Sequence, residues 1–332
     1  MIKRIFSLKR FLIITLLHLI GFSLYFTYQY YRTVDIGDTV ITVIIKPGDS
    51  LNQVARQLLD DGVVESRMML VYPARLMNLD RKLTPGRYDF TGRNSCKSVL
   101  AKLESADFLR IKLTIPEGTT IWKVASLVAA KMQLDSAGLV DLNHDSTFLA
   151  QHNLTTLEGF LFPETYFFTW GVGEKEVAAE MVTMYYSQTD SIWPDSIIGN
   201  LSRYDIVNLA SIIEAETGQK NERALVSSVY HNRLRKRMKL DADPTVIYGL
   251  GGLERPLYRN DLKKDTPYNT YLHRDLPPTP INSPGLAAIK AALNPDESDY
   301  FYFVADNTGG HIFSRTVQEH NRAKQRVKSE QN

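Results

Sequence analysis

The sequence predicts an α+β protein with one membrane-spanning helix near its start. An uncharged stretch runs from Phe11 to Tyr31, and beyond it short runs of β-branched residues alternate with amphipathic helical patterns. Roughly 300 residues follow this stretch, which is enough for two domains by length. We therefore expect a small module over residues 40–106 and a larger mixed α+β domain over residues 110–325.

The stretch from Phe11 to Tyr31 has the length of a transmembrane helix. As a helix it would extend roughly 31 Å, against about 30 Å for the hydrocarbon core of a bilayer. Four basic residues precede it: Lys3, Arg4, Lys9 and Arg10. Because such residues stay in the cytoplasm, we expect residues 1–10 there, residues 11–31 as a retained single-pass anchor, and the rest outside a bacterial inner (cell) membrane. A cleaved signal peptide or an interfacial helix is the alternative.

Composition argues against several classes of function. A formal charge of +2 gives no strong basic field for nucleic acid. Cys96 is the single cysteine, so no intramolecular disulfide forms and a packing role is expected. The histidines lack the spacing of metal ligands, and the sequence has neither a Gly-x-Ser-x-Gly elbow nor a phosphate-binding loop. We therefore expect no metal and no cofactor, and acid/base chemistry by a carboxyl group remains.

Residues 40–106 have the pattern of a small self-contained module. The expected elements are a strand at Val40–Ile45, a turn at Lys46-Pro-Gly-Asp49, a helix capped by Ser50, a helix around 66–77, a turn at Thr84–Tyr88 and a helix over 95–103. This order of strand, Pro-Gly-Asp turn and helix resembles LysM-type sugar-binding modules. Similar turns also occur before helices in proteins that bind no sugar.

The larger domain begins with a second strand, turn and helix, at Leu113–Ala125, and a long helical region follows. Its later elements are expected to be an amphipathic helix over Glu222–Met238, a proline-rich loop over Tyr268–Gly285, a helix over Leu286–Leu293 and a strand over Tyr300–Val304. Four basic residues lie at the C-terminal end of the amphipathic helix and are expected to be solvated: Arg233, Arg235, Lys236 and Arg237. The proline-rich loop has the composition of a rigid polar wall.

An apolar helical run ends in two carboxylates, at Leu209-Ala-Ser-Ile-Ile-Glu-Ala-Glu-Thr217. At helical spacing Glu216 extends the apolar stripe of Leu209, Ile212 and Ile213. Such surroundings raise the pKa of a carboxyl group and keep it protonated near neutral pH. Glu214 lies about 200° around the helix and cannot share that face. One glutamate is therefore expected to work alone; the alternative is that both are solvated at a helix end.

Further motifs follow one another along the chain. They are Glu158-Gly-Phe-Leu-Phe-Pro-Glu-Thr-Tyr166, Asp243-Pro-Thr-Val-Ile-Tyr-Gly249, Tyr268-Asn-Thr270, Leu276-Pro-Pro278, Asn294-Pro295, and Tyr302-Phe-Val304 with His311 and Phe313. Together with the glutamate segment they closely resemble the endolytic murein transglycosylases, the YceG-like family, from the anchor to about Asn321. Asn282-Ser283 departs from the family's pattern, which leaves the sugar subsites open.

The resemblance implies that Glu216, the second glutamate of the Glu-x-Glu-Thr motif, is the catalytic acid and base. It would protonate the glycosidic oxygen between N-acetylmuramic acid and N-acetylglucosamine, then take the proton of the muramoyl C6 hydroxyl and so close a 1,6-anhydro ring. The supporting or substrate-binding residues would be Glu214, Glu158, Glu164, Asp243, Thr245, Tyr248, Tyr268 and Asn269. Roles in turns and fold stability are the alternative for Asp243, Tyr248, Tyr268 and Asn269.

The implied partners are peptidoglycan glycan strands and the membrane, with peptidoglycan synthases as candidate protein partners and no nucleic acid. A membrane-tethered enzyme of this kind would cut within nascent strands and end their elongation. Two alternatives remain. One is a water-using muramidase with Glu164 or Asp243 as its second carboxylate. The other is a non-catalytic, anchored peptidoglycan-binding scaffold.

Overall fold

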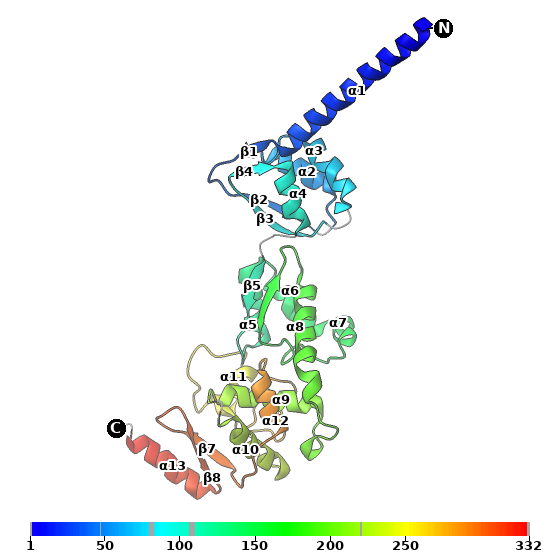
Figure 1. Ribbon diagram of the computed structural model, residues 1–332. Coiled ribbons are helices and arrows are strands. Elements are labelled where there is room, and N and C mark those ends of the chain that lie inside the picture. Colours follow the sequence, from blue (N-terminus) through cyan, green and yellow to red (C-terminus); the bar gives the residue numbers. More distant parts are fainter. Residues whose placement is uncertain (1, 47, 80–82, 106–109, 220, 331–332) are drawn as a thin grey trace. The chain divides into compact units, whose positions relative to one another are not determined.

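A computed structural model describes residues 2–46, 48–79, 83–105, 110–219 and 221–330 (Figure 1). Pro47 of the predicted turn and Ala106, the predicted end of the small module, lie outside these ranges. The chain divides into two compact units. The first comprises Met1–Lys112 with Phe167–Val172, and the second comprises Leu113–Tyr166 with Gly173–Asn332. The class is mixed α+β, as the sequence predicts.

The chain opens with a long helix, α1 (Ile2–Tyr31). Its segment Arg10–Tyr31, 22 residues long, is long and apolar enough to cross a membrane by length and composition. None of that segment is buried inside the protein. Large apolar side chains between Phe11 and Leu24 are exposed, which fits a helix that meets a lipid environment.

The first unit pairs short antiparallel strands and packs three helices beside them (Figure 1). Strand β1 (Thr33–Asp35) pairs with β4 (Arg93–Ser95), and β2 (Ile41–Ile45) pairs with β3 (Gly86–Phe90). The helices are α2 (Leu51–Asp60), α3 (Arg67–Leu76) and α4 (Cys96–Glu104). The predicted cap is confirmed, because the Ser50 hydroxyl accepts a hydrogen bond from the amide of Gln53 within a capping box.

The predicted turn at Thr84–Tyr88 is wrong over its second half. Residues from Gly86 onward form strand β3, whose side chains alternate between buried and half-exposed positions. Pro85 stands just before this strand, a position that proline tolerates because no ladder hydrogen bond is lost there. Gly86 therefore begins the strand that pairs with β2, and residues from Gly86 onward form no turn.

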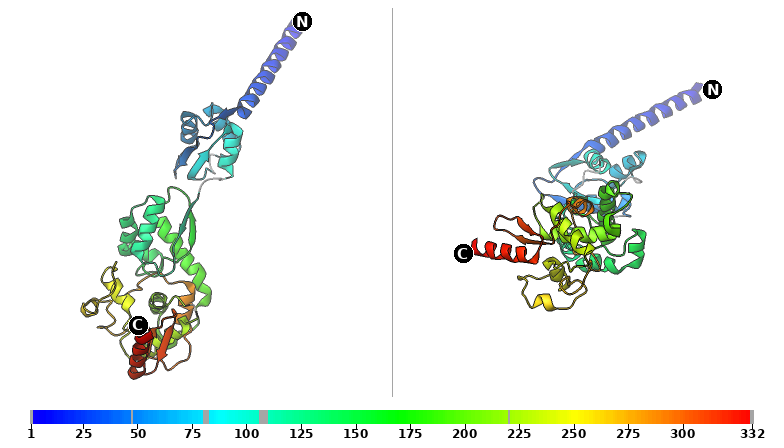
Figure 2. Two further views of the ribbon diagram at one scale, coloured as in Figure 1. Left: turned by 90° about the vertical axis from the view of Figure 1, so that its left-hand side faces the viewer. Right: turned by 90° about the horizontal axis from the view of Figure 1, so that it is seen from below.

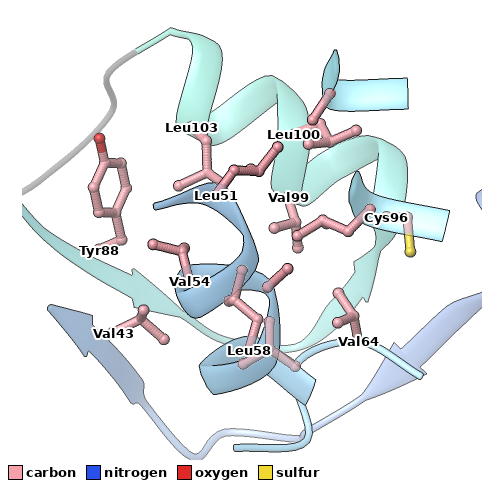
Figure 3. Packing of buried hydrophobic residues seen from close by; sticks show 14 of the residues in the cluster. Val43, Leu51, Val54, Leu58, Val64, Tyr88, Cys96, Val99, Leu100 and Leu103 are labelled. Atoms are coloured by element: carbon pink, nitrogen blue, oxygen red, sulfur yellow. The ribbon is translucent and has the colours of Figure 1, made fainter. Parts of the chain in front are cut away.

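The core of the first unit lies between strands β2 and β3 and the three helices (Figure 3). Val43 and Tyr88 enter it from the strands, Leu58 from α2, and Leu100 from α4. Cys96 is also buried there, and burial raises the pKa of its thiol to about 11. A thiol with so high a pKa is unreactive at neutral pH, so its role is packing.

The chain continues with a two-stranded ribbon and a group of helices. Strand β5 (Ile111–Thr114) pairs with β6 (Thr165–Phe168), and the helices that accompany them are α5 (Ile121–Met132), α6 (Ser136–Asp141), α7 (Ser146–Gln151) and α8 (Glu174–Thr189). The amide of Ile115 donates to the carbonyl of Glu164 at 2.9 Å and extends the ribbon. This arrangement brings the predicted strand, turn and helix of residues 113–125 next to the peptide Glu158–Tyr166.

Four further helices form the centre of the second unit: α9 (Arg203–Glu216), α10 (Arg223–Arg235), α11 (Asp243–Gly249) and α12 (Leu286–Leu293). Helix α9 is buried along most of its length, and α12 and α10 both pack against it. Helix α12 has the bounds that the sequence predicts. Every residue from Ile206 to Ile213 is buried, because neighbouring elements cover α9 on more than one face.

The last elements are a two-stranded ribbon and a helix, of which the sequence analysis predicted only the first strand. Strand β7 (Tyr302–Ala305) pairs with β8 (His311–Ser314), and α13 (Val317–Glu330) lies beside them (Figure 2). The start of β8 is tied to α10, because the His311 ring nitrogen Nδ1 and amide both bond the Glu222 carboxylate, at 2.7 and 3.2 Å.

The expected solvation of all four cations near the end of α10 is wrong for Arg233. Its side chain is buried, whereas Arg235, Lys236 and Arg237 are exposed. The Arg233 guanidinium donates to the carbonyls of Lys239, Leu240 and Phe301 and to the Asp241 carboxylate. A planar donor fork of this kind holds several acceptors at once, so Arg233 fixes the segment that leads into α11.

Candidate active site

Glu216 is the last residue of α9, where the apolar run meets the site. The helix ends there because Thr217 adopts an extended conformation with φ of −137°. The hydroxyl of Tyr230, on α10, donates to Glu216 Oε1 at 2.8 Å. Tyr230 is itself 1% exposed, so this bond is shielded from water. The packing of α10 against α9 therefore positions the carboxyl group.

Burial raises the pKa of Glu216 to about 7. The Tyr230 hydrogen bond opposes this rise, the nearby charge of Asp243 adds to it, and the Arg233 guanidinium lowers it. The side chain keeps partial contact with solvent and is half-buried. A carboxyl group of this kind is partly protonated at neutral pH and can both give and take a proton.

Glu214, two residues earlier, has a different environment. Arg223 Nη2 donates to Glu214 Oε1 at 2.7 Å, and both side chains are only 6% exposed. The amide of Gly285 donates to the other carboxylate oxygen, Oε2, at 3.0 Å. Burial raises the pKa of Glu214, while these two partners lower it. Glu214 is thus a buried partner that joins α9, α10 and the start of α12.

Asp243, the first residue of α11, is exposed and lies close enough to Glu216 for its charge to raise the pKa of that group. Tyr271 donates its hydroxyl hydrogen to Asp243 Oδ1 at 2.7 Å. The charges of both Asp243 and Glu216 act on the Tyr271 hydroxyl, whose pKa is raised chiefly by burial. These contacts bring Asp243 and Tyr271 to the same site as Glu216.

Glu158 is a second buried carboxyl group with a perturbed pKa. It is 1% exposed, and burial raises its pKa to about 7. The amide of Ile121, in the first turn of α5, lies 3.2 Å from both carboxylate oxygens, and Tyr248 donates to Oε2 at 3.0 Å. Gly159 follows with φ of +89°, and an added Cβ would lie 2.5 Å from Pro280, so only glycine fits there.

The other predicted site residues fall into two groups. Tyr248 and Tyr268 are half-buried and touch each other, with ring centroids 4.8 Å apart. Thr245 and Asn269 are fully buried and bond inside the domain: Thr245 Oγ1 to the carbonyl of Ala242, and Asn269 Nδ2 to the carbonyls of Leu262 and Lys264.

Glu164 is exposed at the start of β6 and bonds the amide of Thr165. The structure therefore groups Glu216 with Asp243, and Glu158 with Tyr248 and Tyr268. It brings Thr245 and Asn269 into the fold beneath these groups, with no exposed surface of their own.

A hollow of about 560 Å³ adjoins the site. Ala215, between the two glutamates, lines it together with Pro244, which follows Asp243. Trp122 and Tyr248 form another part of its wall. A larger hollow of about 1160 Å³ lies among Asn208, His231 and Pro277, and neither Glu216 nor its direct neighbours line it. The smaller hollow is the candidate site, because the direct neighbours of Glu216 and Asp243 line it, as does Tyr248, which bonds Glu158.

Three residues of the site were not predicted from the sequence: Tyr230, Arg223 and Tyr271. Tyr230 and Arg223 lie in the segment treated as an amphipathic helix, and their pairing with Glu216 and Glu214 depends on how α10 crosses α9. No spacing rule in one sequence relates residues on two packed helices. Tyr271 lies in the proline-rich loop, whose composition predicted a polar wall. That composition did not single out Tyr271.

Fold and site together define a mixed α+β protein whose candidate site holds carboxyl groups with raised pKa. Among the described residues, no group of three or more His, Cys, Asp or Glu side chains is placed to hold a metal ion. Residues 43–326 match the YceG-like family. The chain belongs to that family, as the ordered motifs predict.

Known relatives agree with this assignment. The chain is 30% identical over 313 residues to an endolytic murein transglycosylase of Bacillus subtilis (strain 168), which covers 89% of this chain and 86% of that protein. It is 28% identical over 319 residues to an endolytic murein transglycosylase of Streptococcus pneumoniae (strain ATCC BAA-255 / R6), spanning 84% of this chain and 56% of that relative. A crystal structure of a yceG-like protein from Listeria monocytogenes is 30% identical with a TM-score of 0.58, covering 86% of this chain and 100% of that one.

Proposed function

We propose that this protein is an endolytic peptidoglycan lytic transglycosylase. It would cleave the bond between N-acetylmuramic acid and N-acetylglucosamine within glycan strands and leave 1,6-anhydro-N-acetylmuramic acid ends. The observation that carries the proposal is the Glu216 carboxyl group, which is held by Tyr230 at 2.8 Å and has a pKa of about 7. The family membership and the names of the curated relatives support it.

The reaction needs one acid/base group. Protonated Glu216 gives its proton to the glycosidic oxygen as the bond from that oxygen to C1 of the muramoyl residue breaks. The resulting Glu216 carboxylate then takes the proton of the C6 hydroxyl, whose oxygen bonds to C1 and closes the anhydro ring. Proton and electron pairs balance without water. Because Tyr230 holds Oε1, we assign the transferred proton to Oε2.

The neighbouring carboxyl groups support this one-carboxyl scheme. Glu214 is paired with Arg223, and Glu158 is held by Tyr248 and the amide of Ile121. Asp243 is exposed and acts electrostatically on Glu216, so a water-using muramidase with Asp243 as second carboxylate is the competing function. We assign Asp243 and Tyr271 to orienting the glycan, because their hydrogen bond fixes polar atoms beside Glu216.

Digestion of purified peptidoglycan in ¹⁸O-labelled water tests the proposal. The expected products carry 1,6-anhydromuramoyl ends and no label, since the C6 hydroxyl and not water is the nucleophile. Mass spectrometry of the fragments measures both features. Label in a free reducing muramoyl end would establish the muramidase instead, and the absence of any cleavage would favour a non-catalytic scaffold.

The pH dependence of kcat/KM should follow the protonation of Glu216. Its pKa is raised to about 7, so the acid form that starts the reaction is present below that pH and is lost above it. We expect kcat/KM to fall as pH rises through about 7. Glu158 has a similar pKa, and a Glu158→Gln variant should keep the same fall. A flat profile from about pH 6 to about pH 8 would contradict the assignment.

We further propose that α1 anchors the chain in the bacterial inner (cell) membrane, with the rest of the chain outside it. The length and apolar composition of Arg10–Tyr31 support this placement, which protease treatment of intact spheroplasts can test. The small module would contribute LysM-like affinity for glycan, so that cleavage takes place on nascent strands and ends their elongation. Peptidoglycan synthases at the same membrane are the proposed protein partners.

A further inference from the structure

An exposed aromatic surface lies beside the candidate active site. The indole of Trp122 is 38% exposed, although tryptophan is usually well buried. One face of the indole stacks on the ring of Tyr248, with centroids 4.9 Å apart and 29° between the planes. Tyr248 in turn touches Tyr268 at 4.8 Å. The three rings form a continuous aromatic row, in which Trp122 is stacked on Tyr248 and Tyr268 is tilted by 58° from Tyr248.

Hydrogen bonds hold these rings in place. Glu158 accepts the hydroxyl hydrogen of Tyr248 and the amide hydrogen of Ile121, the residue that precedes Trp122. Tyr268 and Thr279 share a hydrogen bond of 2.8 Å. One buried carboxylate therefore fixes both members of the outer pair, Trp122 and Tyr248. A surface fixed in this way loses little conformational entropy when a ligand binds.

Two of the rings, Trp122 and Tyr248, line the hollow of about 560 Å³ beside the candidate active site. Ala215 and Pro244, the neighbours of Glu216 and Asp243, line the same hollow. Its volume is in the range of sites that enclose small ligands. Polar side chains also line it and surround the aromatic wall: Thr120, Lys123, Ser126 and Glu254.

We propose that Trp122 is a sugar-binding platform for an N-acetylhexosamine ring of the glycan, next to the bond that is cleaved. A pyranose ring has an apolar C–H face and a polar edge. The apolar face matches the open face of the indole, and the hydroxyl and acetamido groups meet the polar residues around it. The place of this platform in the reaction rests on the proposed transglycosylase function. Its affinity for sugar is tested separately.

The test uses the full-length Glu216→Gln chain in detergent, so that bound glycan is not cleaved. Calorimetric titration with a hexamer of N-acetylglucosamine should show about 10-fold weaker binding for Trp122→Ala, since one well-stacked ring contributes that order of affinity. Trp122→Phe, which keeps a flat ring, should retain most of the affinity. Tyr258→Ala is the matched control, because Tyr258 is also exposed, at 58%, and does not line the hollow. Equal affinity of Trp122→Ala and Tyr258→Ala would overturn the proposal.

A second measurement does not depend on the folding of Trp122→Ala. The indole N–H signal of Trp122, assigned by its loss in Trp122→Phe, should shift on addition of the hexamer, and no shift at saturation overturns the platform. In the active chain, Trp122→Ala should raise KM, Trp122→Phe should raise it less, and Tyr258→Ala should leave KM and kcat unchanged. Sugar binding without cleavage by the wild-type chain would refute the transglycosylase but not the platform. Cleavage with no effect of Trp122→Ala on KM would refute the platform alone.

Discussion

Glu216→Gln is expected to abolish peptidoglycan cleavage while the fold and glycan binding persist. The amide is nearly isosteric but cannot give or take a proton, and loss of a general acid or base costs about 10²–10⁴-fold in rate. The loss should lie at the upper end, because Glu216 serves both proton transfers. Turnover of purified peptidoglycan measures it. Glu180→Gln, at an exposed carboxyl group on α8, is the matched control and should keep full activity.

Thermal unfolding separates this loss from misfolding. The pKa of Glu216 is raised from 4.5 to about 7 in the folded protein, so its contribution to stability is lost as pH rises from about 4.5 to about 7. Glutamine removes this penalty, and Glu216→Gln should unfold at the same or a higher temperature than wild type above pH 7. Full activity in Glu216→Gln together with an inactive Glu214→Gln variant would transfer the catalytic role to Glu214.

Arg223→Met is expected to destabilise the second unit strongly. The Arg223–Glu214 pair is joined at 2.7 Å with both side chains 6% exposed, so removal of the guanidinium leaves a buried carboxylate without its charge partner. Breaking a buried pair in this way costs about 3–5 kcal/mol. For domains of this size each kcal/mol lowers Tm by about 2–4 °C, so a fall of roughly 10 °C is expected. Circular dichroism during heating measures it.

Two further variants make the test specific. The double variant Glu214→Gln/Arg223→Met removes both charges and should recover part of the lost stability. Arg326→Met breaks the exposed pair of Arg326 with Glu330, whose side chains are 74% and 48% exposed, and should change Tm little. If Arg223→Met and Arg326→Met lower Tm by the same small amount, the buried pair does not stabilise the unit as proposed.

Local patterns along the chain were enough to predict much of the fold. Ser50 caps α2, and α12 spans Leu286–Leu293, because capping groups and apolar periodicity act within a few residues. The raised pKa of Glu216 was also predictable, since the apolar stripe that buries it lies in the preceding two turns of its own helix. The Pro-Gly pair led to the wrong prediction of a turn at Thr84–Tyr88. Proline and glycine also occur where a strand begins, and the partner of β3 is distant in sequence.

The sequence alone identified the α+β class, the apolar helix, predicted at Phe11–Tyr31 and found at Arg10–Tyr31, the family and a candidate catalytic carboxyl group. Only the tertiary structure decided which partners each charged group has. Arg233 was predicted to be solvated at a helix end but is buried, where it donates to backbone carbonyls. Arg223 on α10 forms an ion pair with Glu214 on α9. The same holds for the stack of Trp122 on Tyr248, more than 100 residues apart in sequence. The physical reason is that hydrogen bonds, ion pairs and desolvation depend on distances of a few ångströms, which helix crossings set and residue spacing within one element does not.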